Sequence, residues 1–519
     1  MVMKRVLICM LAAAALAVVA QPASAASKSK SGVQHLHFRY GPLNIRPGSN
    51  LIEYGNRANQ LVEKPSEDGY ITRIKPNLVD MKGRIPPTYK LHLHHGVFLN
   101  LGNGDATSPG LPERFFATGE EKTIFSIPKP YGYFNKATDR WFISYMIHDL
   151  TNNGFKGYLT YDVDFVPAKS KLGRKMRPVK PVWMDVENGH AYPVFDALRG
   201  AGTNGKFTFP DQAPHPYPGT SQPNQWVLPY SGTLVATAGH MHPGGLYDDM
   251  MVVRPGATVT RKKGGPIPGD VPNSVRIFRS KAVYFGHRAP VSWDLAMTGT
   301  NPKWRVHVRK GDILRITTTY ESKLASWYEA MGIMVAWIAP NAHGGTDPFA
   351  RAVSQKGYIT HGHLKENDVH GATAPAVANP LSLPNGTAPN GTVKIENFKY
   401  SSGDLSARGS SKDPPTIKEG QSLTFVNADG PPTTPFQFQI SHSVTACAAP
   451  CDLNTGVSYP IANGLGGFDS GQLGFGPVGS TAFNNKQTWT TPNNLSPGTY
   501  TFFCRVHPFM RGSFRVAPD

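Results

Sequence analysis

The sequence predicts an all-β protein built from several β-sandwiches. Glycine and proline are abundant, with 53 and 46 of the 519 residues, and the spacing typical of amphipathic helices is scarce. Strand-like runs recur between turn clusters, as in YLTYDVDFVP (158–167), RVHVRKGDILRITTTY (305–320) and SLTFVNA (422–428). Many short strands separated by turns are typical of β-sandwiches, and the length allows about three or four domains.

The first 25 residues have the composition of an export signal. They read MVMKRVLICMLAAAALAVVAQPASA, in which Lys4 and Arg5 precede an apolar run and Ala23-Ser24-Ala25 forms a small-residue cleavage site. The apolar run is shorter than the roughly 20 residues that span a bilayer. We interpret residues 1–25 as a secretory signal peptide and expect no transmembrane segment after its removal. The mature protein is expected to be secreted, or to lie in the periplasm or on the exterior of the cell envelope.

The chain is basic, with a formal net charge of +18 and local runs such as KSKLGRKMRPVK (169–180). A basic exported protein tends to associate with anionic cell-surface polymers or lipid headgroups. No nucleic-acid-reading motif accompanies the charge, so we expect no nucleic-acid partner.

The C-terminal region, 392–519, carries a thiolate, two imidazoles and a thioether. Cys504, His507 and Met510 lie in the closing segment CRVHPFM, and His442 lies on an earlier strand in SHSVTA. One cysteine, two histidines and a weak methionine select a trigonal copper with a long axial bond, suited to one-electron transfer.

This region resembles the cupredoxins, or type 1 blue copper proteins, and its short Cys-x-x-His-x-x-Met loop is most similar to that of amicyanins. The resemblance implies a Greek-key β-sandwich over 392–519. It also implies one type 1 copper held by His442, Cys504, His507 and Met510.

Two further cysteines follow His442 in the segment CAAPC. In an oxidising compartment Cys447 and Cys451 are expected to form a local disulfide, which leaves Cys504 as the odd thiol. A second soft-metal site is the other interpretation of this pair.

The region before the cupredoxin-like segment is too long for one ordinary sandwich. Residues 365–391 are rich in Ala, Pro, Asn and Gly and are predicted to be a linker. Upstream, the sequence predicts two sandwiches, over 26–175 and 176–364, with the boundary in the basic, proline-containing run.

A second metal site is predicted at GHMHPGG (239–245). Residues two apart point to the same side of a strand, so His240 and His242 converge. No cysteine exists in 26–446, and a sulfur ligand here would therefore be a methionine. Imidazole with thioether suits copper better than zinc, calcium or magnesium. The remaining histidines and methionines of interest are His92, His94, His95, His148, Met331 and Met334.

The order His-His, lone His, His-x-His and Met resembles that of the copper type II, ascorbate-dependent monooxygenases. That family, which includes the peptidylglycine α-hydroxylating and dopamine β-monooxygenases, has two jelly-roll-like sandwiches and two separate mononuclear coppers. The resemblance implies an electron-supplying copper at His94, His95 and His148. It implies an O2-binding, hydroxylating copper at the catalytic residues His240, His242 and Met331.

Several features depart from that family. Its animal members are held by disulfides, and this region has no cysteine. Ala238 stands where the peptide-amidating members hold the substrate with an arginine, so peptide amidation is not expected. An undistorted strand would pair His92 with His94, and the adjacent pair His94–His95 can share a metal only at a twist or bulge.

Other candidates receive structural interpretations. We interpret His92 as structural and Met334 as core packing, with Met334 as the reserve ligand if Met331 is not one. The pairs His35–His37 and His361–His363 are interpreted as surface or structural residues.

Together these patterns predict an exported multicopper protein that hydroxylates a C–H bond of an organic substrate with O2. The cupredoxin would be an electron-transfer module, since a tether raises the local concentration of a donor. Ascorbate or a redox protein is the expected reductant. The alternative is a non-catalytic exported protein for copper binding or electron transfer. A third interpretation is a scaffold that kept the fold and lost some ligands.

Overall fold

The structure is a computed structural model and describes residues 27–28, 32–49, 52–53, 61–88, 90–151, 153–190, 193–260, 270–285, 294–364, 377–429, 440–447, 467–475, 485–507 and 509–519. The predicted signal peptide lies outside these residues. Strands account for about half of these described residues, and none of them lies in an α-helix, which confirms the all-β fold class. No helix in these ranges is long and apolar enough to cross a membrane.

The first sandwich consists of two antiparallel sheets around one core. One sheet contains β1 (Ser27–Lys28), β2 (Gln34–Ile45), β11 (Phe155–Pro167), β5 (Gly69–Asp80), β8 (Phe125–Ser126) and β9 (Tyr131–Asn135). The other contains β3 (Ile52–Glu53), β4 (Leu61–Val62), β10 (Trp141–Asp149), β6 (Leu91–Gly104) and β7 (Pro112–Gly119). Ile74, Tyr161, Phe98 and Trp141 from the two sheets belong to the same buried cluster.

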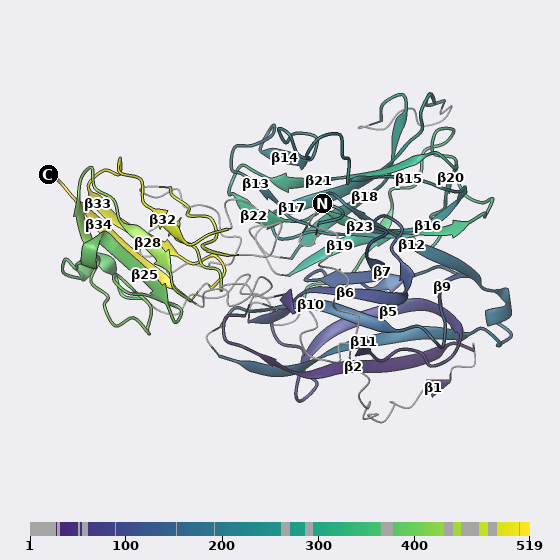
Figure 1. Cartoon of the computed structure of the whole chain (residues 1–519), viewed down its shortest axis with the longest axis horizontal. Helices are drawn as coiled ribbons and strands as arrows, with labels where there is room; N and C mark the ends of the chain where they lie inside the picture. Colours follow the sequence, from purple (N-terminus) through teal and green to yellow (C-terminus); the bar gives the residue numbers. More distant parts are fainter. Residues whose placement is uncertain are drawn as a thin grey trace, which may run out of the picture.

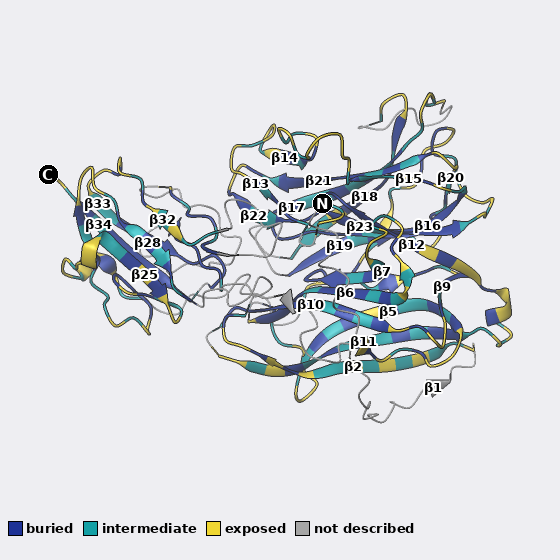
Figure 2. Cartoon of the chain, in the orientation of Figure 1, coloured by how far each residue is buried: buried dark blue, intermediate teal, exposed yellow. Residues whose placement is uncertain are grey.

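Strand β11 shows why these residues form a sandwich. Leu159, Tyr161, Val163 and Phe165 are buried, and the residues between them are half-buried. Successive side chains of a strand point to opposite faces, so this alternation turns one apolar face toward the core. Figure 2 shows the same alternation as bands of dark blue and lighter colour along the strands.

The second sandwich is built around a larger buried cluster. One sheet contains β12 (Arg177–Asp185), β23 (Ile333–Pro340), β16 (Gly232–His240), β19 (Leu295–Thr300), β20 (Val306–Val308) and β24 (Gly357–Ile359). The other contains β14 (Lys206–Phe209), β15 (Gln225–Val227), β21 (Ile313–Glu321), β17 (Gly245–Val253) and β18 (Ser274–Tyr284), and β13 (Phe195–Ala197) pairs with β22 (Trp327–Ala330).

The two sandwiches share a strand and part of a core. Strand β12, which follows the 3-10 helix η1 (Gly173–Lys175), pairs in parallel with β9 and antiparallel with β23. Hydrogen bonding therefore continues through a 17-stranded sheet. Val235 and Trp337 of the second sandwich also belong to the buried cluster of the first. The predicted boundary falls at this shared strand.

The C-terminal sandwich has its own core. Its strands are β25 (Thr392–Glu396), β26 (Lys399–Tyr400), β28 (Thr424–Asn427) and β32 (Thr488–Thr490) in one sheet, β27 (Thr416–Lys418), β29 (Thr445–Cys447), β33 (Gly498–Phe503) and β34 (Arg511–Ala517) in another, and the pair β30 (Gly474–Phe475) and β31 (Asn485–Lys486). Phe425, Tyr500 and Phe514 lie in the buried cluster.

Only the second part of the predicted linker is described. It contains the short 3-10 helices η2 (Pro380–Ser382) and η3 (Pro389–Gly391). The Arg515 guanidinium on β34 donates hydrogen bonds to the carbonyl oxygens of Pro380 and Leu383, at 2.5 and 2.7 Å. Residues 377–391 therefore pack on the C-terminal sandwich.

The C-terminal sandwich lies at one end of the molecule, against the first two (Figure 1). His507 Nε2 lies 2.9 Å from the carbonyl oxygen of Gly48, in the loop after β2. Arg505 donates to the carbonyl oxygen of Ser326, which directly precedes β22. The loop carrying the predicted type 1 ligands thus faces the other two sandwiches.

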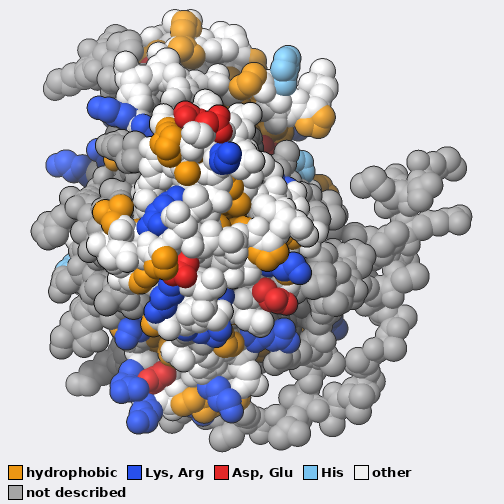
Figure 3. Space-filling model, turned by 90° about the vertical axis from the view of Figure 1, so that its left-hand side faces the viewer, with side chains coloured by type: hydrophobic (Ala, Val, Ile, Leu, Met, Phe, Trp, Pro, Cys, Tyr) orange, Lys and Arg blue, Asp and Glu red, His pale blue; other side chains and the backbone are white. Residues whose placement is uncertain are grey.

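Figure 3 views the molecule from the end that carries this sandwich. Lys and Arg side chains are spread over this face among fewer acidic ones. The basic excess of the sequence is dispersed on this face and does not gather in one groove.

Candidate metal centres

A β-bulge on β6 brings the predicted histidines of the first site together. Residue pairing between β6 and β10 runs from His148 opposite His92 to Ile147 opposite Leu93, then steps to Met146 opposite His95. His94 is the extra residue at this step. The distortion that an adjacent histidine pair requires is therefore present.

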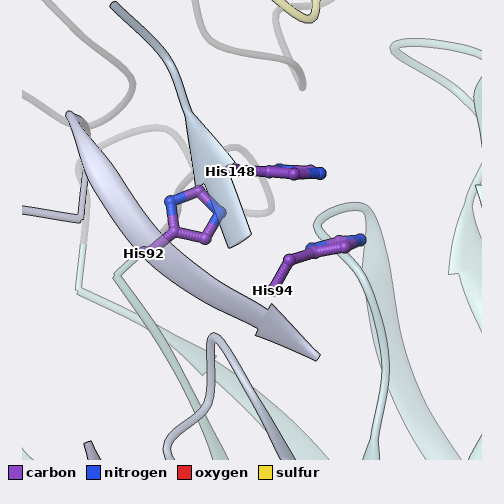
Figure 4. A group of neighbouring side chains, drawn as sticks. All are labelled: His92, His94 and His148. Atoms are coloured by element: carbon purple, nitrogen blue, oxygen red, sulfur yellow. The ribbon is translucent and has the colours of Figure 1, made fainter. Parts of the chain in front are cut away.

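His92, His94 and His148 form a buried group (Figure 4). Their ring nitrogens include one from each residue within 4.8 Å of the others. The rings of His94 and His148 stack at 3.9 Å with 14° between their planes. His92, which the sequence analysis interprets as structural, lies in this group because it is directly opposite His148. Its Nδ1 lies 2.6 Å from the Thr88 carbonyl oxygen.

The two predicted histidine sets meet in one cluster. His95 Nε2 lies 2.8 Å from His242 Nε2, and His94, His95 and His242 again offer three nitrogens within 4.8 Å. His240 and His95 are also neighbours, with ring centroids 5.1 Å apart. The resemblance implies two separate sites, whereas the structure joins their histidines into a contiguous group across the sandwich–sandwich boundary.

The histidines are held by backbone and carboxylate partners. His242 Nδ1 lies 2.7 Å from the Glu329 carbonyl oxygen. His240 Nδ1 lies 2.8 Å from Glu121 Oε2, and His94 Nδ1 contacts Glu120 Oε1. Both glutamates are buried. The sequence does not indicate this role, because a Glu-Glu pair after a strand has no ligand spacing of its own.

Burial governs the protonation of the cluster. It lowers the pKa values of His92 and His242 to about 3. Burial, with the neighbouring imidazoles adding to it, also lowers the pKa values of His94, His95 and His148 well below their usual range. These five imidazoles are therefore neutral at physiological pH, which is the form that binds metals.

Burial acts differently on the two glutamates. It raises the pKa of Glu120 well above its usual range, and the charge of Glu121 adds to this effect. Burial also tends to raise the pKa of Glu121, but His240 outweighs it and lowers the value.

Met331 lies close to His242 through the backbone. His240 pairs with Ile333 at the end of the β16–β23 ladder, and His242 and Met331 each lie two residues beyond this pair on their own segments. The Tyr320 hydroxyl accepts from the His242 amide at 3.0 Å and donates to the Met331 carbonyl oxygen at 2.7 Å. The Met331 side chain is buried with Trp183.

Met334, the reserve ligand, is fully buried in the main core of the second sandwich. It is opposite Gly239, next to the histidines in register but on the core side. The structure therefore gives Met334 a packing role.

His442, Cys504 and His507, three of the four predicted C-terminal ligands, lie together. The Cys504 sulfur lies 3.8 Å from His442 Nδ1 and 3.7 Å from His507 Nδ1, and the two Nδ1 atoms are 3.2 Å apart. Met510 is fully buried in the same core. The amides of Ser443 and His507 donate to the sulfur at 3.4 and 3.3 Å.

Neighbouring groups prepare this site for a metal. Burial raises the pKa of the Cys504 thiol, but hydrogen bonds from His442 and His507 outweigh it and hold the value well below its usual range. His442 Nε2 lies 2.8 Å from Asp429 Oδ2, so its Nδ1 faces the sulfur. The site therefore offers a thiolate and two oriented imidazoles.

The predicted disulfide is described at one end only. Cys447 is disulfide-bonded. Cys451 lies outside the described residues, and Cys504 is a free, buried thiol. The interpretation of Cys504 as the odd cysteine is consistent with this.

A pocket lies between the histidine cluster and the C-terminal loop. One side is formed by His94, His148 and His242, and apolar walls come from Trp327 and Pro243. The other side is formed by Ser443, Gly471, Gln472, Arg505 and Val506 of the C-terminal sandwich. Both predicted metal regions therefore border the same space.

The outlying histidine pairs behave as expected. His35 and His37 are exposed and lie 2.7 and 2.6 Å from Asp164 and Asp162 on the paired strand. His363 Nδ1 lies 2.5 Å from Asp294 Oδ2. None of these residues belongs to a three-ligand group among the described residues.

Comparison with known proteins adds no family. No family model and no curated protein matches the chain. The Cu-containing nitrite reductase from Thermus scotoductus SA-01 aligns at 14% identity and a TM-score of 0.15, over 55% of this chain and 54% of that one. The VP2 subviral particle of infectious bursal disease virus aligns at 10% identity and a TM-score of 0.16, over 66% and 80%. Likenesses at these TM-scores carry no argument about function.

Proposed function

We propose that this chain is an exported copper-dependent oxidoreductase that hydroxylates a C–H bond of an organic substrate with O2. In this proposal the histidine cluster with Met331 holds the catalytic copper, and His442, Cys504, His507 and Met510 hold a type 1 copper. The observation that carries the proposal is a pocket lined on one side by His94, His148 and His242 and on the other by Ser443, Arg505 and Val506, which are chain neighbours of the type 1 ligands. A site for one-electron transfer beside a site for small-molecule chemistry is the arrangement that such a reaction requires.

The residues fit copper. His240 Nε2 is buried and has no hydrogen-bond partner among the described residues, while its Nδ1 is occupied by Glu121. A buried, unsatisfied imidazole nitrogen is costly unless it binds something. Neutral imidazoles with thioether, and thiolate with imidazoles and thioether, are donor sets that suit copper.

Copper bound at these residues would supply one-electron redox chemistry and O2 binding. The protein's own contribution is positional. Asp429 orients His442, and the Tyr320 hydroxyl links the backbones of His242 and Met331. Trp327 and Pro243 give the pocket apolar walls that exclude water around the reacting groups.

The C-terminal sandwich would deliver electrons. Val506 and Arg505, the neighbours of the Cys504 and His507 ligands, line the pocket together with His94 and His148. Docking of a donor on its acceptor removes the need for diffusional encounter. Ascorbate or an external redox protein would reduce the type 1 site again.

The proposal is tested by removing the thioether of Met331. The copper-loaded full chain is supplied with ascorbate and no organic substrate, and the uncoupled reduction of O2 by ascorbate is followed for wild type, Met331→Leu and the core control Met334→Leu. Because leucine keeps the volume and removes the sulfur, we expect Met331→Leu to lose most O2 consumption and Met334→Leu to keep it. Equal rates in wild type and Met331→Leu would remove Met331 from the mechanism.

The non-catalytic alternative is separated by the copper content and O2 consumption of the wild-type protein, because Cys504→Ser does not distinguish the two functions. Loss of the thiolate removes the blue absorption of a type 1 site in either case. Wild-type protein that shows this absorption, binds no copper at the histidine cluster and consumes no O2 is an electron carrier.

A further inference from the structure

We propose that Glu120 and Glu121 are positioning residues, one for each half of the histidine cluster. Each carboxylate occupies Nδ1 of one histidine and so directs Nε2 of that ring toward the metal. This inference rests on the proposed role of His94 and His240 as metal ligands. It adds two residues that neither the ligand spacing nor the resemblance implies.

Glu121 is built into its position from three sides. Its Oε1 accepts from the Gly119 amide and from the Thr123 hydroxyl, each at 2.9 Å. Its backbone carbonyl accepts from the Thr360 hydroxyl at 2.9 Å. The other carboxylate oxygen, Oε2, is thereby left to face His240 Nδ1 at 2.8 Å.

Glu120 makes the matching contact on the other half. Its Oε1 contacts His94 Nδ1, and the residue is only 1% exposed. The contact occupies Nδ1, which assigns the metal-ligand role to Nε2.

The two consecutive glutamates contact histidines of both sandwiches. They form the turn directly after β7 of the first sandwich, and their carboxylates contact different histidines. His94 lies on β6 of the same sandwich, and His240 ends β16 of the second. One turn of chain therefore sets ring orientation in both predicted ligand sets.

Carboxylate–histidine–metal contacts fix the tautomer and raise ligand basicity, and their loss typically costs about 10- to 100-fold in metal affinity. Glutamine is nearly isosteric with glutamate, but at position 121 it would favour the opposite tautomer of His240. If its oxygen keeps the Gly119 and Thr123 contacts, its NH2 group donates toward His240 Nδ1. The ring proton must then sit on Nε2, the atom that should bind the metal.

The experiment uses the copper-free full chain with Cu²⁺ as the probe, in wild type, Glu120→Gln and Glu121→Gln. Glu113→Gln is the matched control, because Glu113 is a half-buried glutamate that accepts from Tyr133 and Asn103 near the same strand. Affinity is measured by titration, and the copper environment by electron paramagnetic resonance. The blue absorption measures how much copper the type 1 site holds in each variant. The Tm of the copper-free protein shows whether the fold is retained.

We expect about 10- to 100-fold weaker copper binding at the histidine cluster in both test variants, with altered hyperfine splitting. The control and the blue absorption should remain at wild-type values. Wild-type affinity and spectra in both test variants would overturn the inference. The inference would also be overturned if copper is lost only when Tm falls, because that result indicates a structural role for the glutamates.

The two proposals fail separately in these measurements. A wild-type protein that consumes no O2 ends the proposed function. The glutamate variants still decide the positioning role in that protein, because copper affinity and spectra require no turnover.

Discussion

Gly119 leaves no room for a side chain beside the histidine cluster. A Cβ atom there would lie 2.6 Å from His240 Cε1, 2.6 Å from the His94 carbonyl oxygen and 2.8 Å from Glu121 Oε2. The His94 carbonyl oxygen belongs to the backbone and the His240 ring is buried, so neither can move without disturbing the packing around it. Glycine at this position therefore permits the close approach of both ligand strands.

We predict that Gly119→Ala loses copper from the histidine cluster and keeps the type 1 site. The added methyl displaces His240 or the turn that carries Glu121. The check is copper stoichiometry with blue absorption on the purified variant. Gly110→Ala is the control, since a Cβ at Gly110 meets nothing within 4 Å. Full copper content in Gly119→Ala would contradict the steric argument.

At the same scale, some ligands could be predicted from the sequence and others could not. Cys504 and His507 lie on one loop, so their spacing keeps them near each other, and the structure brings both to His442. The sequence favours a structural role for His92 because the cross-strand register that sets it opposite His148 is not visible there.

At the scale of elements, the β6–β7 hairpin is held by a buried ion pair. The guanidinium of Arg114 donates to both carboxylate oxygens of Asp105, at 2.8 and 2.9 Å, and stacks over Trp183 of β12. Burial tends to raise the pKa of Asp105, but the bonds from Arg114 outweigh it and lower the value. The pair thus anchors the strands that lead to Glu120 and Glu121.

We predict that Asp105→Asn lowers the free energy of unfolding by about 3–5 kcal/mol at neutral pH, because it leaves a buried guanidinium without its counter-charge. The folded-state pKa of Asp105 lies below its unfolded value. Its contribution is therefore complete above about pH 4 and lost as the pH falls through the folded value. Denaturant titrations across this range should show the difference between wild type and variant shrinking at acid pH.

The control for this prediction is Arg84→Gln, which breaks the exposed pair between Arg84 and Asp80. A surface pair contributes about 0–1 kcal/mol. A loss in Asp105→Asn as small as that in Arg84→Gln would show that the buried pair does not anchor the hairpin.

Strand content was predictable because alternation is local, as in β11. The sharing of β12 was not, because its partners β9 and β23 are set by tertiary packing. The merging of two histidine sets has the same origin. Each histidine set can be recognised in its own sequence segment. The distance of 2.8 Å between His95 Nε2 and His242 Nε2 depends on how the two sandwiches pack together.

At the scale of the whole molecule, the Gly48 turn docks the C-terminal sandwich. Gly48 has φ of +61°, and a Cβ there would lie 2.0 Å from a Phe398 ring carbon. Phe398 packs edge-on against His507, with ring centroids 5.0 Å apart. The carbonyl of Gly48 itself faces His507 Nε2.

We predict that Gly48→Ala undocks the C-terminal sandwich and leaves its blue absorption intact. Small-angle scattering should show a larger radius of gyration, and reoxidation of the type 1 site by O2 should slow. Gly83→Ala is the matched control, because Gly83 also has positive φ, +77°, and its Cβ would meet nothing within 4 Å. Identical scattering of the two variants would exclude the docking role.

The strand shared by the two sandwiches has a consequence for how the chain folds. β12 is made well before β23, its partner in the second sandwich, and Trp337, which fills the first core, comes as late as β23. Contacts this distant along the chain carry a large loop-closure cost and form slowly. The core of the first sandwich is therefore completed only by residues that are synthesised after most of the second sandwich.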